Sequence, residues 1–297
     1  MELTAGQRRT FDTLIRPGRA PPGPEVIASV RAGLEAELSS LGLPKEATVR
    51  LSKGRVDANA RCEGWFDGLL RAEGAPFAYG PASAAGTLAH RAIQLDIASE
   101  RSGDVRAVVE RAAERLAEGD RAFGRYWQML DALDRAERLS AASAHLALFR
   151  DMFPAADRSW QPVSEQYLAA NLAGRSVVLS GRIDLILGRG PYLLIDFKNG
   201  QAWPGHAEDM RFYALLVALL RPTAPYRVAT VFLESMDWQA EEVTEEVLLH
   251  AAGRVAAAVR TAADLARRNA LLTPGPHCRF CPRARTCPAS LVLQAGA

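Results

Sequence analysis

The sequence has few lysines and no long apolar run. Of its 36 basic residues, three are lysines (Lys45, Lys53 and Lys198) and the other 33 are arginines. No hydrophobic stretch approaches the ~18 residues that cross a membrane, and the first residues lack the basic-then-apolar pattern of a signal peptide. We therefore expect a cytoplasmic protein with no membrane partner. Where arginine is so strongly preferred, a lysine either survives by chance or fills a role that needs a compact, deprotonatable ammonium.

The sequence also lacks a strong excess of charge and an ATP-binding motif. The 36 basic residues face 34 acidic ones, so bulk charge does not predict nucleic-acid binding, although a local basic groove is compatible with it. No GxxxxGK[ST] pattern is present, which argues against an ATP-driven motor in this chain. The hydrophobic content of 48% is sufficient for a sizeable core in one large domain or two small ones.

Helical and strand-like patterns occupy different parts of the chain. Residues 1–50 read as a Pro/Gly-rich arm followed by a helix, and helical spacing dominates residues 51–155. Residues 156–240 contain short apolar or β-branched runs between Gly and Pro, which predict strands joined by turns, and one helix near 206–220. Residues 241–297 hold an alanine-rich helix and a Pro/Cys-rich loop. We predict an α/β fold with a mixed sheet flanked by helices.

Two acids and a lysine cluster near the predicted hairpin. Asp184 lies in SGRIDLILG, and Asp196 and Lys198 flank Phe197 in LLIDFKNG. Residues two apart on a strand face the same side, so Asp196 and Lys198 are expected to be neighbours. Two carboxylates can hold a hard divalent cation, and an ammonium beside them can orient or deprotonate a water. The alternative is a solvated strand end, but ions directly after an apolar run are expected to be partly buried and to need partners.

The four cysteines form one spaced set, Cys62, Cys278, Cys281 and Cys287. Three of them lie in one ten-residue stretch of a Pro/Arg-rich loop. A loop of this composition is unlike a buried core. Disulfides are not expected in a cytoplasmic chain, so metal or cluster ligation is the leading interpretation. Four thiolates suit either tetrahedral Zn²⁺ or an iron–sulfur cluster, and ligand chemistry alone does not choose between them.

The ordered motifs resemble the PD-(D/E)XK nuclease superfamily, in particular its RecB-like exonuclease branch. GRID and IDFKNG are similar to that branch's second and third motifs, and GTLAH, ending at His90, is similar to its first. In the frame of its QxxxY motif, Tyr213 is present but Asp209 replaces the glutamine. Glu165 stands where the family often has an acid. Taken alone, His90 would read as an ordinary helix histidine and Tyr213 as a core aromatic.

The resemblance implies a restriction-endonuclease-like core and assigns the site. It makes Asp184, Asp196, Lys198 and Tyr213 the catalytic residues. The expected ligands of Mg²⁺ or Mn²⁺ are His90, Asp184, Asp196 and the Phe197 carbonyl. The replacement of glutamine by Asp209 puts the usual DNA-positioning role of QxxxY in question, since a further carboxylate repels phosphate or recruits a second cation.

The resemblance also favours a [4Fe–4S] cluster over zinc. Nucleases of this branch that carry such a cluster have one cysteine before the core and three after it. LSKGRVDANARCEGWF is similar to the helix that leads to the first of these cysteines. The implied role of Cys62, Cys278, Cys281 and Cys287 is to join the N- and C-terminal segments around the core. The motif matches run from about Ser52 to Cys287.

These observations predict a metal-dependent DNA nuclease, most simply an exonuclease acting on single-stranded or frayed ends. A helicase, recombination or defence-system protein is a candidate partner. The alternatives are a catalytically weak DNA-binding or scaffolding subunit of a repair or defence complex, and a zinc-stapled nucleic-acid-binding module. Candidate DNA contacts are Arg182, Arg211, Arg279, Arg283, Arg285, Trp65, Trp203 and Phe280.

Overall fold

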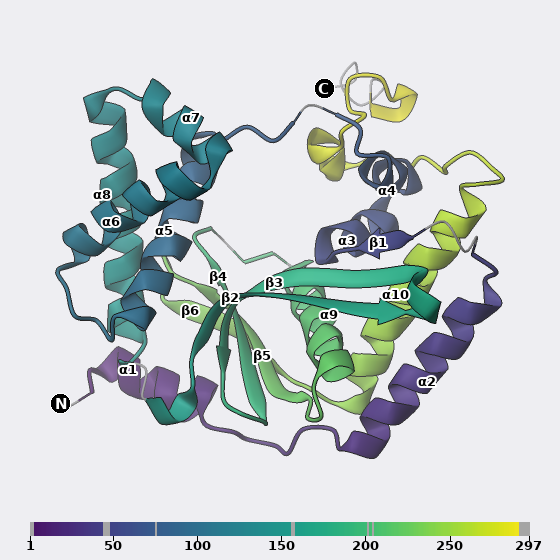
Figure 1. The fold of residues 1–297 in the computed structure, drawn as a ribbon, viewed down its shortest axis with the longest axis horizontal. Coiled ribbons are helices and arrows are strands. Elements are labelled where there is room, and N and C mark those ends of the chain that lie inside the picture. Colours follow the sequence, from purple (N-terminus) through teal and green to yellow (C-terminus); the bar gives the residue numbers. More distant parts are fainter. Residues whose placement is uncertain are drawn as a thin grey trace.

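A computed structural model describes residues 3–43, 48–74, 76–155, 158–200, 202–203 and 205–290 (Figure 1). Lys45 lies outside these ranges. Among the described residues, no helix combines the length and the apolar character needed to cross a bilayer.

One six-stranded sheet runs through the middle of the protein, and helices cover both of its faces. The strands are β1 (Val49–Leu51), β2 (Val163–Leu172), β3 (Val177–Leu187), β4 (Tyr192–Lys198), β5 (Pro225–Phe232) and β6 (Asp237–Glu242). The α-helices are α1 (Ala5–Arg9), α2 (Pro24–Ser40), α3 (Lys53–Arg61), α4 (Glu63–Leu70), α5 (Pro81–Ala98), α6 (Val105–Gly119), α7 (Arg121–Met129), α8 (Ala132–Met152), α9 (Gly205–Leu220) and α10 (Glu245–Asp264). The other helical segments are the π-helix η1 (Thr10–Ile15) and the 3₁₀-helices η2 (Arg158–Trp160), η3 (Ala173–Arg175) and η4 (Pro276–Phe280).

The predicted mixed α/β architecture is confirmed. The strand-like runs of the sequence form β2 to β5, and the helix expected near 206–220 is α9. The sheet is mixed because β1–β3 and β4–β5 are parallel pairs, whereas β2–β3, β3–β4 and β5–β6 are antiparallel. The sequence pattern did not reveal β1 or β6, since β1 is only three residues long and β6 (DWQAEE) is largely polar.

Strand β3 is bonded to three other strands. A strand has two edges, and β2 occupies one of them along nearly its whole length. The other edge is therefore shared: β1 pairs with it at Val177–Leu179, and β4 pairs with it at Leu185–Leu187. Between these two pairings, β3 and its neighbours on that side separate. The candidate site lies beside this gap.

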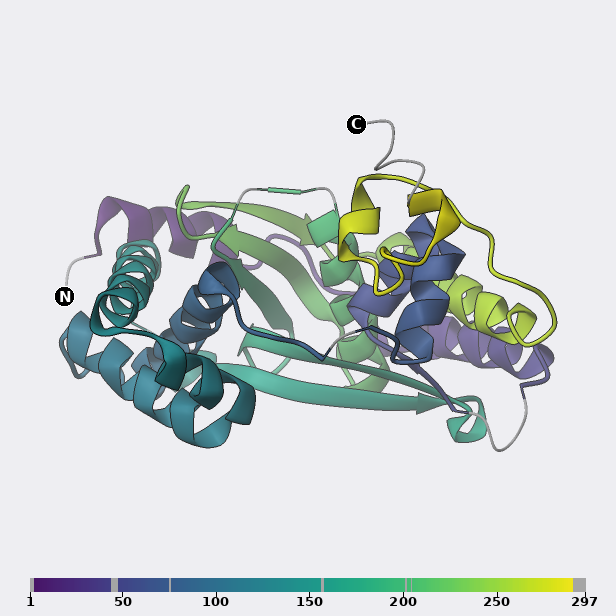
Figure 2. The same cartoon turned by 90° about the horizontal axis from the view of Figure 1, so that it is seen from above.

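The side-chain alternation of β4 assigns the two faces of the sheet. Leu193, Ile195 and Phe197 pack into a core with α5, α6, α8 and η1. Tyr192 and Leu194 pack into a second core with α2, α9 and α10. Figures 1 and 2 show α5 to α8 grouped on one side of the molecule, and α2 and α10 on the other, with the C-terminal segment lying over α3 and α4. Asp196 interrupts an otherwise buried apolar strand.

Tyr213 of α9 is held against the stretch of β3 that lies between its pairings with β1 and β4. Its hydroxyl donates a hydrogen bond of 2.6 Å to the carbonyl oxygen of Arg182, and its ring lies on the backbone of Gly181. A Cβ atom built on Gly181 would lie 2.6 Å from Cε1 of Tyr213, much closer than real Cβ contacts. Gly181 is thus required for the close approach of α9 to the sheet.

We expect Gly181→Ala to destabilise the protein by about 1–3 kcal/mol, because the new methyl group must displace the Tyr213 ring in a packed core. Chemical denaturation followed by circular dichroism measures this. Gly253→Ala is the matched control: no atom lies within 4 Å of its Cβ position in α10, so it should stabilise the helix by about 0.5–1 kcal/mol. A Gly181→Ala variant as stable as wild type would contradict the packing described here.

Candidate active site

Asp184 and Asp196 lie where β3 and β4 separate. Leu185 and Ile195 are the ladder pair nearest to them, and the next two residues are the acids. In place of a further ladder bond, the Asp184 carboxylate accepts a 2.7 Å hydrogen bond from the Phe197 backbone N–H. The Asp184 side chain is 11% exposed and that of Asp196 is 4% exposed. The end of the β3–β4 pairing therefore places two nearly buried carboxylates side by side.

Each oxygen of Asp196 faces a lysine. Lys198, two residues along the same strand, contacts Oδ2, and Lys53 Nζ lies 3.0 Å from Oδ1. Burial alone would raise the pKa of Asp196, but the two ammonium groups hold it below its usual value. Asp196 is therefore ionised despite its position inside the sheet.

Asp184 has a different electrostatic environment. Burial raises its pKa, and repulsion by the charge of Asp196 adds to this effect, while His90 opposes it. His90 Nδ1 lies 3.5 Å from Asp184 Oδ2 and 3.7 Å from Glu165 Oε1. Burial disfavours the imidazolium, but the two acids outweigh it and raise the pKa of His90 to about 10. Without a bound cation, the proton on His90 offsets the charge of these acids, and binding of a cation by the imidazole would release that proton.

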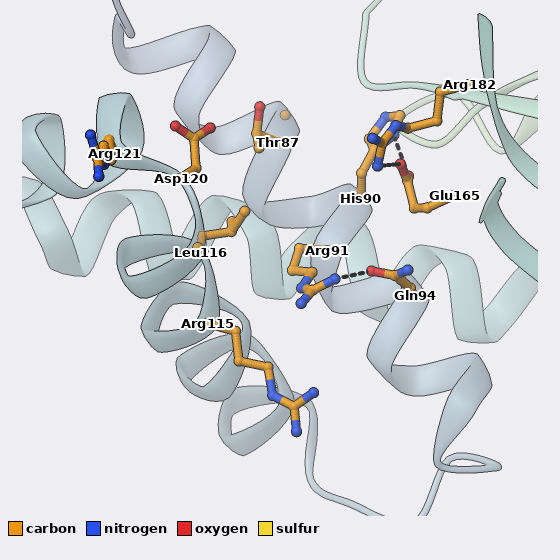
Figure 3. Close-up of a pocket in the computed structure, with 12 residues that line it drawn as sticks. Thr87, His90, Arg91, Gln94, Arg115, Leu116, Asp120, Arg121, Glu165 and Arg182 are labelled. Carbon is orange, nitrogen blue, oxygen red and sulfur yellow. Dashed lines mark hydrogen bonds and ion pairs between the residues drawn. The ribbon is translucent and has the colours of Figure 1, made fainter. Parts of the chain in front are cut away.

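His90, Glu165 and Asp184 form a candidate cation site. One ligand atom from each lies within 4.8 Å of the others, and no other group of this kind occurs among the described residues. They come from α5, β2 and β3 respectively, and Figure 3 shows His90 and Glu165 turned towards each other. Carboxylate oxygens with one imidazole suit Mg²⁺ or Mn²⁺, so the residues present fit the expected cation. The remaining expected ligand groups, Asp196 and the Phe197 backbone, lie beside this set.

Glu165 owes its position to an irregularity in β2. Ser164 pairs with Leu185 and Gln166 pairs with Ile183, but Glu165 between them makes no ladder pair with Asp184. Its φ of 55° lies in the left-handed region, which is unfavourable for a residue with a side chain. Such outliers concentrate at functional sites, where surrounding structure holds them.

Lys53 is the site residue that sequence reasoning missed. It is the first residue of α3, and its Nζ lies 3.1 Å from Asp209 as well as beside Asp196. The same Nζ lies 5.0 Å from the centre of the Tyr213 ring. The scarcity of lysine pointed to Lys53 as much as to Lys198. Asp209, expected from the sequence to replace a glutamine, is the partner of this second ammonium.

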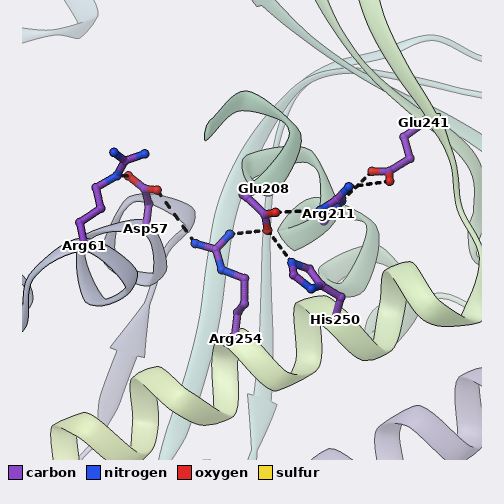
Figure 4. A network of polar contacts seen from close by, with 7 residues as sticks. All are labelled: Asp57, Arg61, Glu208, Arg211, Glu241, His250 and Arg254. Carbon is purple, nitrogen blue, oxygen red and sulfur yellow. Dashed lines mark hydrogen bonds and ion pairs between the residues drawn. The ribbon is translucent and has the colours of Figure 1, made fainter. Parts of the chain in front are cut away.

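A polar network fixes the helices that carry Asp209 and Lys53 (Figure 4). Glu208 of α9 contacts Arg254 of α10, lies 2.9 Å from His250 and accepts from Arg211. Arg211 in turn forms a double hydrogen bond of 2.8 Å to Glu241 of β6. Arg211, a candidate DNA contact from sequence, is thus engaged with two carboxylates.

The four cysteines line one small cavity, together with Trp65 and His277. Backbone N–H groups of Thr273 and Gly275 point at the sulfurs of Cys62 and Cys278, each over 3.4 Å. Among the described residues, no three cysteine sulfurs lie within 4.8 Å of one another. A formed zinc tetrahedron would bring its sulfurs to about 3.8 Å, so the sulfurs do not form a compact ligand set.

Other contacts dock the C-terminal segment on α4 and the residues beside it. Arg283 pairs with Asp67 at 2.9 Å and with Glu73 at 2.5 Å, and Arg268 pairs with Glu63. Trp65 stacks on His277, with ring centres 5.6 Å apart. Arg283 and Trp65, expected as DNA contacts, therefore join the C-terminal segment to α4 and the residues beside it.

Comparison with known proteins identifies the class. The model of the PD-(D/E)XK nuclease superfamily matches residues 50–288. The chain therefore belongs to the PD-(D/E)XK nuclease superfamily, and its class is that of a nuclease.

Two solved structures resemble the fold. The protein SSO0001 is 13% identical, with 86% of this chain and 95% of that chain covered and a TM-score of 0.38. A protein from Eubacterium rectale named "Putative exonuclease" is also 13% identical, with 86% and 91% covered and a TM-score of 0.46. No curated protein matches the chain significantly.

We expect Lys53→Met to destabilise the protein by about 2 kcal/mol, because Asp209 and one oxygen of Asp196 lose their counter-ion in a largely buried site. Adding Asp209→Asn should recover part of this loss, which a double-mutant cycle of urea denaturation curves measures. Asp237→Asn, which breaks the exposed pair with Arg9, is the control and should change stability by less than about 0.5 kcal/mol. Simple additivity of the two site substitutions would contradict the pairing.

Proposed function

We propose that this protein is a metal-dependent DNA nuclease that degrades single-stranded or frayed DNA from its ends. The observation that carries the proposal is the pair of nearly buried acids, Asp184 and Asp196, with the cation-compatible group of His90 and Glu165 on one side and Lys198 on the other. Membership of a nuclease superfamily supports hydrolysis of nucleic acid as the reaction. A scaffold has no need to keep such ions together.

In this proposal, His90, Glu165, Asp184, Asp196 and the Phe197 carbonyl would hold Mg²⁺ or Mn²⁺. When bound, the cation supplies charge stabilisation at the scissile phosphate and a more acidic water. Asp196 has lone pairs beyond the two that face its lysines, so it can serve both as a ligand and as their anchor.

Lys198 would orient the attacking water. To take up the proton of that water, its ammonium would first leave Asp196 and lose its own proton to solvent. Lys53, kept charged by Asp196 and Asp209, would balance the negative charge that builds up on the phosphate. Tyr213, bonded to the Arg182 carbonyl and packed near Lys53, would keep α9 and that ammonium in place.

We expect Lys198→Ala and Asp196→Asn to lower the cleavage rate of end-labelled single-stranded DNA by about 10²–10⁴-fold, because each removes a group that acts on the water or the cation. Cleavage should require Mg²⁺ or Mn²⁺ and stop in EDTA. Arg106→Gln, on the exposed surface of α6, is the control and should cleave like wild type.

A closed circle of single-stranded DNA separates the modes of attack. It has no ends, so it should survive while the linear strand is degraded. Cleavage of the circle would show endonucleolytic attack and would contradict the exonuclease part of the proposal. If wild-type protein bound DNA but never cleaved it with either cation, the DNA-binding or scaffolding alternative would replace the nuclease.

The second part of the proposal is a [4Fe–4S] cluster held by Cys62, Cys278, Cys281 and Cys287. In its favour, all four cysteines line one cavity, and four thiolates are a ligand set that such a cluster takes. Burial and the three neighbouring cysteines raise the pKa of the Cys281 thiol, so without a bound metal this cysteine is a protonated thiol. The cluster would fasten the C-terminal segment to α4.

Protein purified without oxygen should be brown and contain iron and acid-labile sulfide. Cys281→Ser should lose the colour and the iron and unfold at a lower temperature, because the link between the chain ends is broken. Arg285→Gln, in the same loop, should retain both. A colourless wild-type protein with bound zinc would establish the zinc alternative instead.

A further inference from the structure

A cleft of about 710 Å³ opens beside the candidate cation site (Figure 3). Helices α5, α6 and α7 form its walls together with residues of β2 and β3, and His90 and Glu165 lie at one end. Four arginines line it: Arg91, Arg115, Arg121 and Arg182. Figure 3 shows Arg115 and Arg121 on the side away from the cation site, and Arg182 close to His90.

Two of these arginines have no counter-ion among the described residues. Arg115 and Arg121 are exposed and take part in no ion pair or hydrogen bond there. Asp120, next to Arg121, forms no ion pair with it: its carboxylate is turned to the Tyr79 hydroxyl and to the N–H groups that begin α7. Elsewhere arginines such as Arg211 and Arg283 are held by carboxylates.

The other two arginines also keep donors available. Arg91 contacts the neutral amide of Gln94, and the Arg182 side chain is 61% exposed and 3.8 Å from Glu165. The cleft thus presents four arginines against two acids: Asp120 beside Arg121, and Glu165 at the end where a cation is expected. Such a row of cations matches a chain of phosphates.

We infer that this cleft is the track along which one strand of DNA reaches the cation site, its phosphates contacting Arg115 and Arg121 before they reach Arg182. The inference rests on the proposed nuclease function and adds the strand's path to it. None of the described residues that line the cleft is aromatic, so these residues offer no surface for base stacking and would contact the backbone of the strand. Binding is therefore independent of sequence and sensitive to salt.

The test is binding of a fluorescent single-stranded oligothymidylate in EDTA, followed by anisotropy over a range of KCl concentrations. EDTA keeps the DNA intact, so the readout does not require catalysis. For Arg115→Gln/Arg121→Gln, we expect Kd to rise by roughly tenfold at moderate salt. The slope of log K against log[KCl] should become shallower by about 0.7 for each arginine removed. Arg106→Gln, on the same helix but paired with Glu110 outside the cleft, should bind like wild type.

The outcomes separate this inference from the proposed function. If the double variant binds with wild-type Kd and slope while wild-type protein cleaves DNA, the track is wrong and the nuclease stands. If the variant binds weakly but wild-type protein never cleaves, the track stands and the nuclease is wrong. A blunt duplex of equal length is the last arm: an equal loss of duplex affinity would overturn the assignment to a single strand.

Discussion

One ionised carboxylate inside an apolar sheet is the constraint on which the site depends. Asp196 follows a run of buried residues in β4, where an unpaired charge would be neutralised or would cost several kcal/mol. Lys198 is supplied locally, by the alternation of the same strand. Lys53 comes from α3, some 140 residues earlier in the chain, and meets Asp196 only in the assembled fold. The ionised form of Asp196 is thus stable only when both β4 and α3 are in place.

The same constraint explains why a carboxylate is tolerated at Asp209. A third carboxylate near two others would normally be unfavourable, and burial does raise the pKa of Asp209. Lys53 bridges Asp196 and Asp209, so that one ammonium serves two acids. Lys53 therefore makes a carboxylate at position 209 compatible with the buried Asp196 beside it.

Much of the fold could be predicted from local pattern. The apolar runs of β3 and β4 are separated by Gly and Pro, and the spacing of Asp196 and Lys198 follows from strand geometry alone. What could not be predicted depends on contacts between distant segments. The three-residue strand β1 has no periodicity to detect, and the left-handed conformation of Glu165 is not encoded by its residue type. Lys53 is one of three rare lysines in the sequence, but nothing in the pattern placed it in the site, because only the docking of α3 gives it a partner.

The shared edge of β3 has a consequence for how the protein would lose its site on heating. Lys53 is connected to the sheet through Ser52 and the short strand β1, whereas Asp196 belongs to a central strand with pairing on both sides. Short elements at a sheet's margin open in local fluctuations that need far less energy than global unfolding. Lys53 therefore separates from Asp196 more readily than Lys198 does. The first step of inactivation would be the departure of α3 and Lys53. The sheet would stay intact, but Asp196 would keep only one of its two lysine counter-ions.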